Sequence, residues 1–255
     1  MKAMKMTQKS PVLTGLFTST ARGLAALLLI ALPLGAWAQP ALNYGAEVFD
    51  LDKKAKLADF KVEGTDTDGQ NQYVARFTEA GTGKVLVEER ATLKSENGQV
   101  VKVEIDQNQT GGKGVITFDG KKATFSKTED GKTKTSDENV KGDFVVSGNF
   151  QRYVHSKWAD LQAGKTVSFR YGVWERMETV GFQVSKMKDE DKDGAKTTLL
   201  KMKPSSFIIA ALVNPIEFRF NEDGSRLLEM KGRIQVKAKD GSKFKDQDGV
   251  VVYKY

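Results

Sequence analysis

Short segments in which apolar and polar residues alternate recur along the chain from Phe60 onward. A period of two places the apolar side chains on one face of a strand and the polar side chains on the other. Each segment therefore predicts a strand that is buried on one side only. The clearest segments are residues 73–77, 101–105, 167–171, 180–184, 216–220 and 234–238.

Asp-Gly and Asn-Gly pairs separate many of these segments. Such pairs adopt positive φ at low cost and close tight hairpins. Repeated hairpins predict an antiparallel meander, which we expect to contain about ten to twelve strands by this template. The pairs stand at residues 68–69, 97–98, 119–120, 130–131, 223–224, 240–241 and 248–249.

Two segments depart from this alternation and predict helices. Residues 149–163 place Phe150, Val154 and Trp158 on one face at helical spacing, with Asn149 as the expected N-cap. Residues 205–213 are instead apolar on nearly every side, which indicates a short helix buried all round.

The fold class expected from these patterns is mostly β. A flat one-sided sheet of this length would expose a wide apolar face, which soluble monomers rarely show. We therefore expect a large curved antiparallel sheet, a half-open barrel, with one amphipathic helix and one short apolar helix on its concave side. Side chains on these elements are the candidate ligand-binding residues: Phe150, Val154, Trp158, Trp174, Phe207, Ile208 and Leu212.

Residues 1–38 read as a signal peptide. A basic start without acids precedes a short apolar run that is well below the roughly 20 residues of a membrane span. Ala36 and Ala38 supply the small residues of a cleavage site, so the mature chain is expected to begin at Gln39. The domain prediction is a removed leader, 1–38, and a single β-rich domain, 39–255, with no transmembrane anchor after cleavage.

Charge and cysteine content narrow the expected compartment and partners. The whole chain has a net charge of +7 and contains no cysteine. Four of the positive charges lie in the leader, and the remaining basic residues are interspersed with acids. No stripe of one sign is present that would follow phosphates, so we expect no nucleic-acid partner. An export signal without cysteine is typical of a bacterial periplasmic protein.

Candidate catalytic and metal motifs are weak. Residues 189–194 match the first half of an EF-hand loop, but Leu200 stands where the bidentate glutamate is needed. His155 is the single histidine, and no nucleophile elbow accompanies it. Glu175 would face inward by alternation, although a turn between two strands is favoured there. We expect no enzyme, no cofactor and no metal.

The second half of the chain resembles a group of bacterial proteins. The order runs from residues 158–165 into 167–171 and 180–186, and then into 199–204 and 221–228. Over residues 145–235 it is similar to uncharacterised periplasmic families that carry a domain of unknown function. These look like relatives of the half-open barrels of lipoprotein-localisation carriers. The resemblance implies a cavity for acyl chains and assigns no functional residue.

Three functions follow as hypotheses. The first is a periplasmic protein that binds or carries a lipophilic, acyl-type ligand in a half-barrel cavity. The second is a non-catalytic structural or interaction module of the cell envelope with a filled core. The third is a hydrolase that uses His155 or Glu175. The expected partner is a lipophilic ligand or an envelope protein, and the oligomeric state stays open.

Overall fold

The computed structural model describes residues 43–210 and 214–255. The predicted signal peptide and Leu212 lie outside this part, and so does the side chain of Ile208.

Within the described residues, one sheet of fifteen strands dominates the structure, and two further strands form a small hairpin. The strands of the large sheet are β1 (Tyr44–Phe49), β2 (Lys56–Thr67), β3 (Gln70–Glu79), β4 (Val85–Lys94), β5 (Val100–Gln107), β6 (Gly112–Phe118), β7 (Lys122–Glu129), β8 (Lys132–Asn139), β9 (Phe144–Val145), β10 (Val167–Val173), β11 (Glu178–Lys192), β12 (Ala195–Pro204), β13 (Ile216–Asn221), β14 (Leu227–Arg233) and β17 (Asp248–Lys254). The hairpin consists of β15 (Ala238–Asp240) and β16 (Lys243–Lys245).

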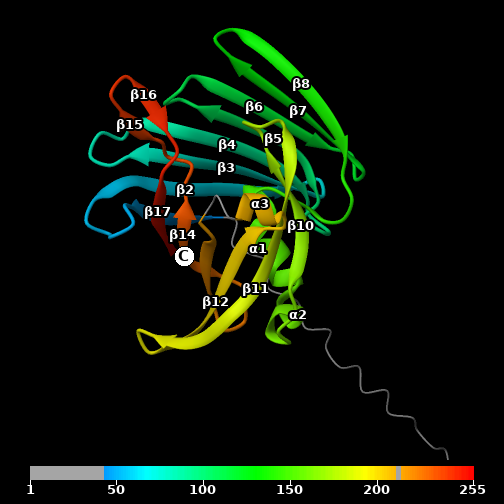
Figure 1. Cartoon of the computed structure of the whole chain (residues 1–255), viewed down its shortest axis with the longest axis vertical. Coiled ribbons are helices and arrows are strands. Elements are labelled where there is room, and N and C mark those ends of the chain that lie inside the picture. The colour runs from blue at the N-terminus through cyan, green and yellow to red at the C-terminus, as the bar shows by residue number, and fades with distance from the viewer. Residues whose placement is uncertain (1–42, 211–213) are drawn as a thin grey trace, which may run out of the picture. The chain divides into compact units, whose positions relative to one another are not determined.

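The sheet is built from two meanders that one strand joins (Figure 1). Strands β8 to β1 lie side by side in reverse chain order, and β10 to β14 do the same on the other side of β17. Neighbouring strands run antiparallel apart from the short β9, which pairs in parallel with β10. The predicted fold class, a curved and mainly antiparallel sheet, is confirmed.

The two edges of the curved sheet approach each other without forming a ladder. The Glu138 carboxylate on β8 accepts a hydrogen bond from the backbone N–H of Thr179 on β11 at 3.1 Å. Arg170 on β10 lies 3.5 Å from the same carboxylate. Ser136 on β8 also donates to the Met177 carbonyl oxygen. Side chains therefore connect the two edges, but no ladder of backbone hydrogen bonds closes the sheet into a barrel within the described residues.

The helix expected over residues 149–163 is broken in two. Helix α1 spans Ser147–Ser156 and α2 spans Trp158–Gln162. Asn149 lies inside the first turn and is not the N-cap. Its Oδ1 accepts a hydrogen bond from the Val146 N–H at 2.8 Å, and its Nδ2 donates to the Phe144 carbonyl at 3.2 Å. The Asn149 side-chain amide therefore supplies hydrogen-bond partners to backbone groups at the start of α1, although Asn149 lies inside the helix.

Helix α1 lies inside the curve of the sheet (Figure 1). A Cβ added at Gly148 would lie 3.1 Å from the Ala91 side chain on β4. The Phe150 ring packs against Phe218 on β13, with 4.5 Å between ring centroids. The helix thus touches both meanders, which are far apart in the order of strands.

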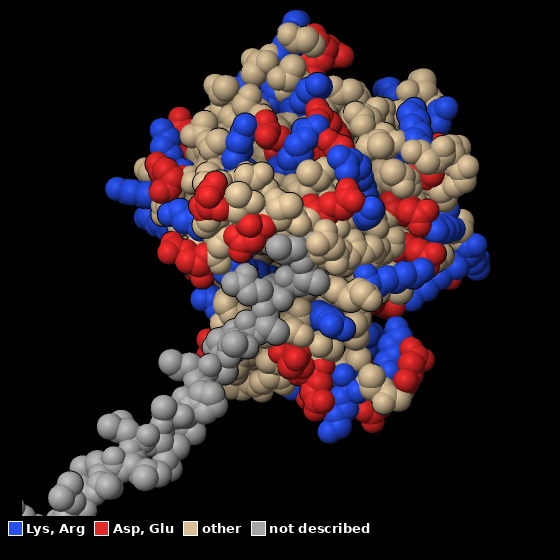
Figure 2. Space-filling model, turned by 180° about the vertical axis from the view of Figure 1, so that it is seen from behind, with Lys and Arg blue, Asp and Glu red and all other residues tan. Residues whose placement is uncertain are grey.

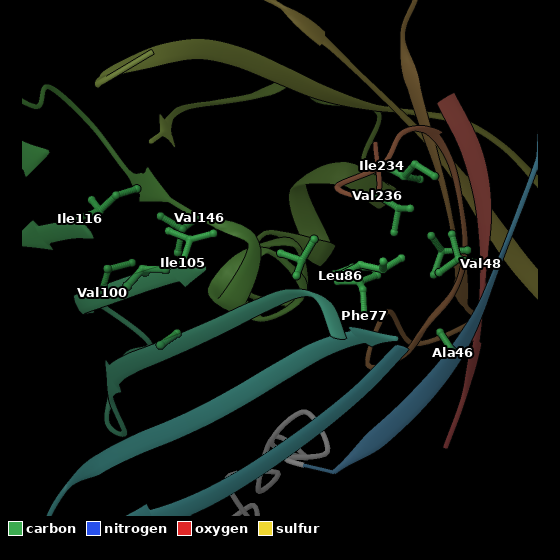
Figure 3. Packing of buried hydrophobic residues seen from close by; sticks show 14 of the residues in the cluster. Ala46, Val48, Phe77, Leu86, Val100, Ile105, Ile116, Val146, Ile234 and Val236 are labelled. Carbon is green, nitrogen blue, oxygen red and sulfur yellow. The ribbon is translucent and has the colours of Figure 1, made fainter. Parts of the chain in front are cut away.

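Two clusters of buried side chains make the core. One joins strands β1 to β7 and includes Val48, Leu86, Ile234 and Val236, which Figure 3 shows together. The other joins α1 and α2 to β10–β14. Met230 and Tyr253 pack against both clusters.

Most of the strand and turn predictions are confirmed. The segments at 73–77, 101–105, 167–171, 180–184 and 216–220 all lie in strands. In the Asp68-Gly69 turn both residues have positive φ, as a two-residue hairpin between antiparallel strands requires. The Asp-Gly pair at 248–249 is an exception because it lies within β17, where Gly249 pairs with Gly232.

The strand predicted over residues 234–238 is wrong. Strand β14 ends at Arg233 and β15 begins at Ala238, and residues 234–237, here called the strap, run between them. The Ile234 and Val236 side chains are buried in the first core cluster. Alternation was present because every second side chain enters the core, but the backbone of the strap does not pair with a neighbouring strand.

The buried helix predicted over residues 205–213 also differs from what is found. Helix α3 covers Phe207–Ala210, and the Phe207 side chain is 88% exposed. One turn of helix after β12 cannot turn every side chain toward the core, so an apolar sequence does not ensure burial here. Among residues 43–210 and 214–255, no helix combines the length and the apolar character that a membrane span needs.

Charged residues of both signs are mixed over the face shown in Figure 2. Many form cross-strand pairs, such as Arg76 with Glu88 at 2.6 Å and Arg90 with Asp106 at 3.1 Å. Exposed pairs of this kind contribute little to stability, about 0–1 kcal/mol each. They give the outer face of the sheet a balanced charge.

Candidate ligand cavity

A cavity of about 450 Å³ lies between α1, the strap and the inner face of the sheet. Every second residue of a strand faces it, as the period of two requires, for example Tyr73, Ala75 and Phe77 on β3. Ligand sites typically have volumes of about 300–1,000 Å³ and mainly apolar walls.

Aromatic rings form a continuous wall on one side of the cavity. The Phe60 ring lies 4.5 Å from Phe77 and 6.3 Å from Tyr253, measured between centroids. Tyr44 packs 6.1 Å from both Phe60 and Tyr253. These four residues come from β1, β2, β3 and β17, so the wall lies where the two meanders join.

A buried carboxyl group interrupts the apolar lining. Glu89 on β4 is 6% exposed and lines the cavity. Burial raises the pKa of its carboxyl group, and hydrogen bonds from Ser147 and Gln235 act in the opposite direction. Burial, with the nearby Glu89 as the next cause, also raises the pKa of the Tyr171 phenol. An acid, a serine and a tyrosine thus meet at one point of the wall.

The strap closes one side of the cavity through side-chain amides. Gln107 on β5 donates from Nε2 to the Gln235 carbonyl oxygen at 3.0 Å. Gln109 holds Lys237 twice, donating to its carbonyl at 2.9 Å and accepting from its N–H at 2.8 Å. Gln247 also donates to the Val236 carbonyl oxygen at 3.1 Å, so side-chain amides and not a strand ladder hold the backbone of the strap.

Ion pairs surround the outer end of the strap. The Lys237 ammonium lies 2.7 Å from Glu175 and 2.5 Å from Asp246. Burial alone would lower the pKa of Lys237, but the hydrogen bonds to Asp246 and Glu175 outweigh burial and raise that pKa. Arg233 pairs with Asp246 and Asp248 at 2.8 and 2.9 Å. All five residues line the cavity, so its rim is charged and its interior is apolar.

Phe150 and Trp174 are the predicted site residues that line the cavity. Phe150 reaches it from α1. Trp174 lies in the turn after β10, and its ring covers Gly114 on β6, where an added Cβ would lie 2.6 Å from the ring. Glu175 lies beside it in the same turn, as the sequence indicated.

Val154 and Trp158 are placed elsewhere. Both are buried in the second core cluster and do not line the cavity. The Trp158 indole N–H donates to the Glu222 carbonyl at 3.3 Å, and its ring covers Gly224. Phe207 is exposed and does not line the cavity either.

The remaining candidates lie away from the cavity. His155 is half-buried on α1. The acidic segment 189–194 forms the end of β11 and its turn into β12. Asp189 accepts a hydrogen bond from Thr198 at 2.7 Å, and Glu190 pairs with Arg219. These carboxylates are used within the sheet.

Glu89, the buried carboxyl group of the cavity, was not predicted from the sequence. The signal was present in the stretch around residues 87–91. Val87 and Ala91 occupy inward positions, so the intervening Glu89 stands where the pattern requires an apolar residue. A charged residue in phase with the buried face of a strand is the feature that would have identified it.

The chain was compared with protein families, curated proteins and solved structures. No family model and no curated protein matches the chain. Among solved structures, the fold is similar to a β-barrel-like protein of the domain of unknown function DUF1849 from Brucella abortus. The TM-score is 0.48 and the sequence identity is 11%, over 85% of this chain and 99% of that chain.

Proposed function

We propose that this protein is a periplasmic, non-catalytic binding protein for a lipophilic, alkyl- or acyl-type ligand. The cavity is the observation that supports the proposal. Its volume of about 450 Å³ and its aromatic and aliphatic walls suit a molecule of drug size or smaller. The alternative, an envelope interaction module, requires a filled core, and the side chains of the described residues do not fill the space.

Removal of an alkyl chain from water drives binding in this proposal. Burial of apolar surface contributes about 25 cal/mol per Å². The space is formed by the folded protein itself, so the walls need little rearrangement when a ligand enters. The strap, which Gln107 and Gln109 hold by hydrogen bonds, forms one side of this space.

Titration with octan-1-ol by calorimetry tests this function. We expect saturable binding with one molecule per protein, and quenching or a shift of Trp174 emission, because its ring lines the cavity. If folded wild-type protein shows no saturable binding of octan-1-ol, the filled-core interaction module becomes the better interpretation.

A matched pair of variants locates the binding. Ala75→Phe adds a ring to the inner wall opposite Glu89, and we expect it to weaken octan-1-ol binding at least tenfold. Thr92→Phe adds the same ring to an outward position of β4 and should leave the affinity within about twofold of wild type, since apolar surface there stays outside the cavity. Equal effects of both variants would place the ligand elsewhere.

A further inference from the structure

Glu89 lies in an apolar environment, in which carboxylates are rarely found. It stands on the inner face of β4, opposite Ala75 on β3 and Ile105 on β5. Both cross-strand neighbours are apolar, and Val87 and Ala91 precede and follow it on the same face. An ionised carboxylate in such a place is costly unless a cation or several donors compensate it.

The protein supplies only neutral donors to this carboxylate. The Ser147 hydroxyl donates to Oε1, and Gln235 Nε2 lies 3.4 Å from Oε2, which is a long contact for a hydrogen bond. Throughout residues 43–210 and 214–255, no ion pair includes Glu89. The negative charge therefore has no protein counter-ion in the described structure.

The basic residues that line the cavity are engaged elsewhere. Arg152 donates to the Asn71 amide oxygen at 3.1 Å and to the Ser95 carbonyl. Arg233 and Lys237 pair with the acids of the rim. None of the three is available to neutralise Glu89 without breaking an existing contact.

Aromatic faces complete the surrounding. Tyr44, Phe60, Phe77 and Tyr253 form the wall described above, and Tyr44 and Tyr171 lie near enough to Glu89 for its charge to raise their pKa values, after burial as the main cause. The negative face of an aromatic ring attracts a cation within about 6 Å, by roughly 0.5–2 kcal/mol. An unpaired acid next to aromatic rings is a combination that suits a positively charged group.

We propose that the ligand of this cavity is a lipophilic amine, whose ammonium group pairs with Glu89 while its alkyl part lies against the aromatic wall. This inference rests on the proposed function. A fatty acid would instead bring a second carboxylate to Glu89, and like charges at this distance repel. An alcohol would fill the same space without compensating the charge.

A purely structural role is the competing explanation. Through Ser147 and Gln235, Glu89 connects the start of α1 and the strap to the sheet. That role predicts that removing the charge changes stability but not the ligand preference. The ligand preference is therefore the quantity that separates the two explanations.

Three ligands of equal chain length give the test: octylamine, octan-1-ol and octanoate, each titrated calorimetrically at pH 7. For the wild type we expect octylamine to bind at least tenfold more tightly than octan-1-ol, and octanoate to bind most weakly. In Glu89→Gln the amine should lose this advantage and come within about threefold of the alcohol. The alcohol itself should bind the variant about as well as it binds the wild type.

Glu88→Gln is the matched control. Glu88 lies on the same strand but faces outward, where it pairs with Arg76 and Arg90. Removing its charge should leave the preference for the amine unchanged. A loss of preference in this variant would indicate a general effect of net charge and would overturn the assignment to Glu89.

A measurement on the wild type covers the case in which Glu89→Gln fails to fold. Burial raises the pKa of Glu89, so the carboxyl group carries a proton at pH values below that raised pKa. An ammonium group that pairs with Glu89 at such a pH displaces this proton. Tyr44 and Tyr171 stay neutral there, since burial raises both of their pKa values. Calorimetry at a series of pH values from 4 to 7, in buffers of different ionisation enthalpy, should show proton release with octylamine in the acidic part of the series and none with octan-1-ol at any pH.

The outcomes are distinguishable. If octan-1-ol binds and octylamine binds no better, or if Glu89→Gln keeps the preference, this inference is overturned and the proposed function stands. If none of the three ligands binds saturably, both are overturned. Absence of proton release with a tightly bound amine also contradicts pairing with Glu89.

Discussion

Gly224→Ala tests how the structure places Trp158, which the sequence assigned to the cavity and the structure assigns to the core. Gly224 lies in the turn between β13 and β14 with φ of 72°. A Cβ at this position would enter the indole ring of Trp158, which is 9% exposed and packed in the second core cluster. The substitution therefore combines backbone strain with overpacking.

Gly69→Ala separates the two contributions. Gly69 has the same φ of 72°, but no atom lies within 4 Å of its added Cβ. Left-handed backbone costs a residue with a Cβ about 1–2 kcal/mol, partly offset by a lower entropy of the unfolded chain. We expect Gly69→Ala to lower the free energy of unfolding by about 1 kcal/mol through this effect alone.

Overpacking should add about 1–3 kcal/mol at Gly224. The total of about 2–4 kcal/mol corresponds to a fall in Tm of roughly 4–16 °C for a domain of this size. Urea unfolding followed by far-UV circular dichroism measures both variants. In a Trp158→Phe background the extra cost at Gly224 should shrink, because the smaller ring leaves more room. Equal destabilisation by Gly224→Ala and Gly69→Ala would refute the placement of the indole.

Three further outcomes are expected. Phe125→Ala, at a fully buried ring, should lower the free energy of unfolding by about 3–5 kcal/mol in urea, whereas Phe244→Ala, at a 39% exposed ring, should change it by about 0.5 kcal/mol or less. Because burial raises the pKa of Glu89, its contribution to stability is complete below the usual value of 4.5 and is lost as the pH rises through the folded-state pKa. Glu89→Gln should thus gain stability relative to the ligand-free wild type from about pH 4.5 upward, by at most about 1.4 kcal/mol per pH unit, and a difference independent of pH would contradict this. Gly114→Val should displace the Trp174 ring and shift its emission to the red, while a spectrum unchanged from wild type would show that the ring does not lie on β6.

Strand alternation predicted the fold well because each side chain of a sheet with one buried face points either to the core or to solvent. Residues 73–77 and 216–220 could be assigned without knowing their partners. The pattern failed at residues 234–238, where alternate burial arises from a strap that enters the core. Nothing in the period distinguishes these two cases, since the hydrogen bonds that differ are made with Gln107 and Gln109, which are distant in sequence.

The site was harder to predict than the fold. Helical spacing correctly grouped Phe150, Val154 and Trp158 on an apolar face, but it does not show which part of that face meets another wall and which part meets a space. Phe150 packs against Phe218 on β13 and borders the cavity, whereas Trp158 follows the break at Lys157 and packs against the β13–β14 turn. Which helix residues border the cavity and which pack in the core depends on how widely the sheet curves, and that curvature is set by all of its strands together.

Strand β17 has a consequence for the order in which the protein folds. It pairs with β1 on one side and with β14 on the other, so Val251 lies opposite both Val48 and Met230. Hairpins such as β2–β3 or β11–β12 can form from neighbouring residues, but the β1–β17 ladder joins segments about 200 residues apart and is expected to form late. Until then the two meanders are separate sheets, each with an apolar face open to water and to other chains. Formation of the cavity and protection from aggregation therefore depend on the same step, the docking of β17.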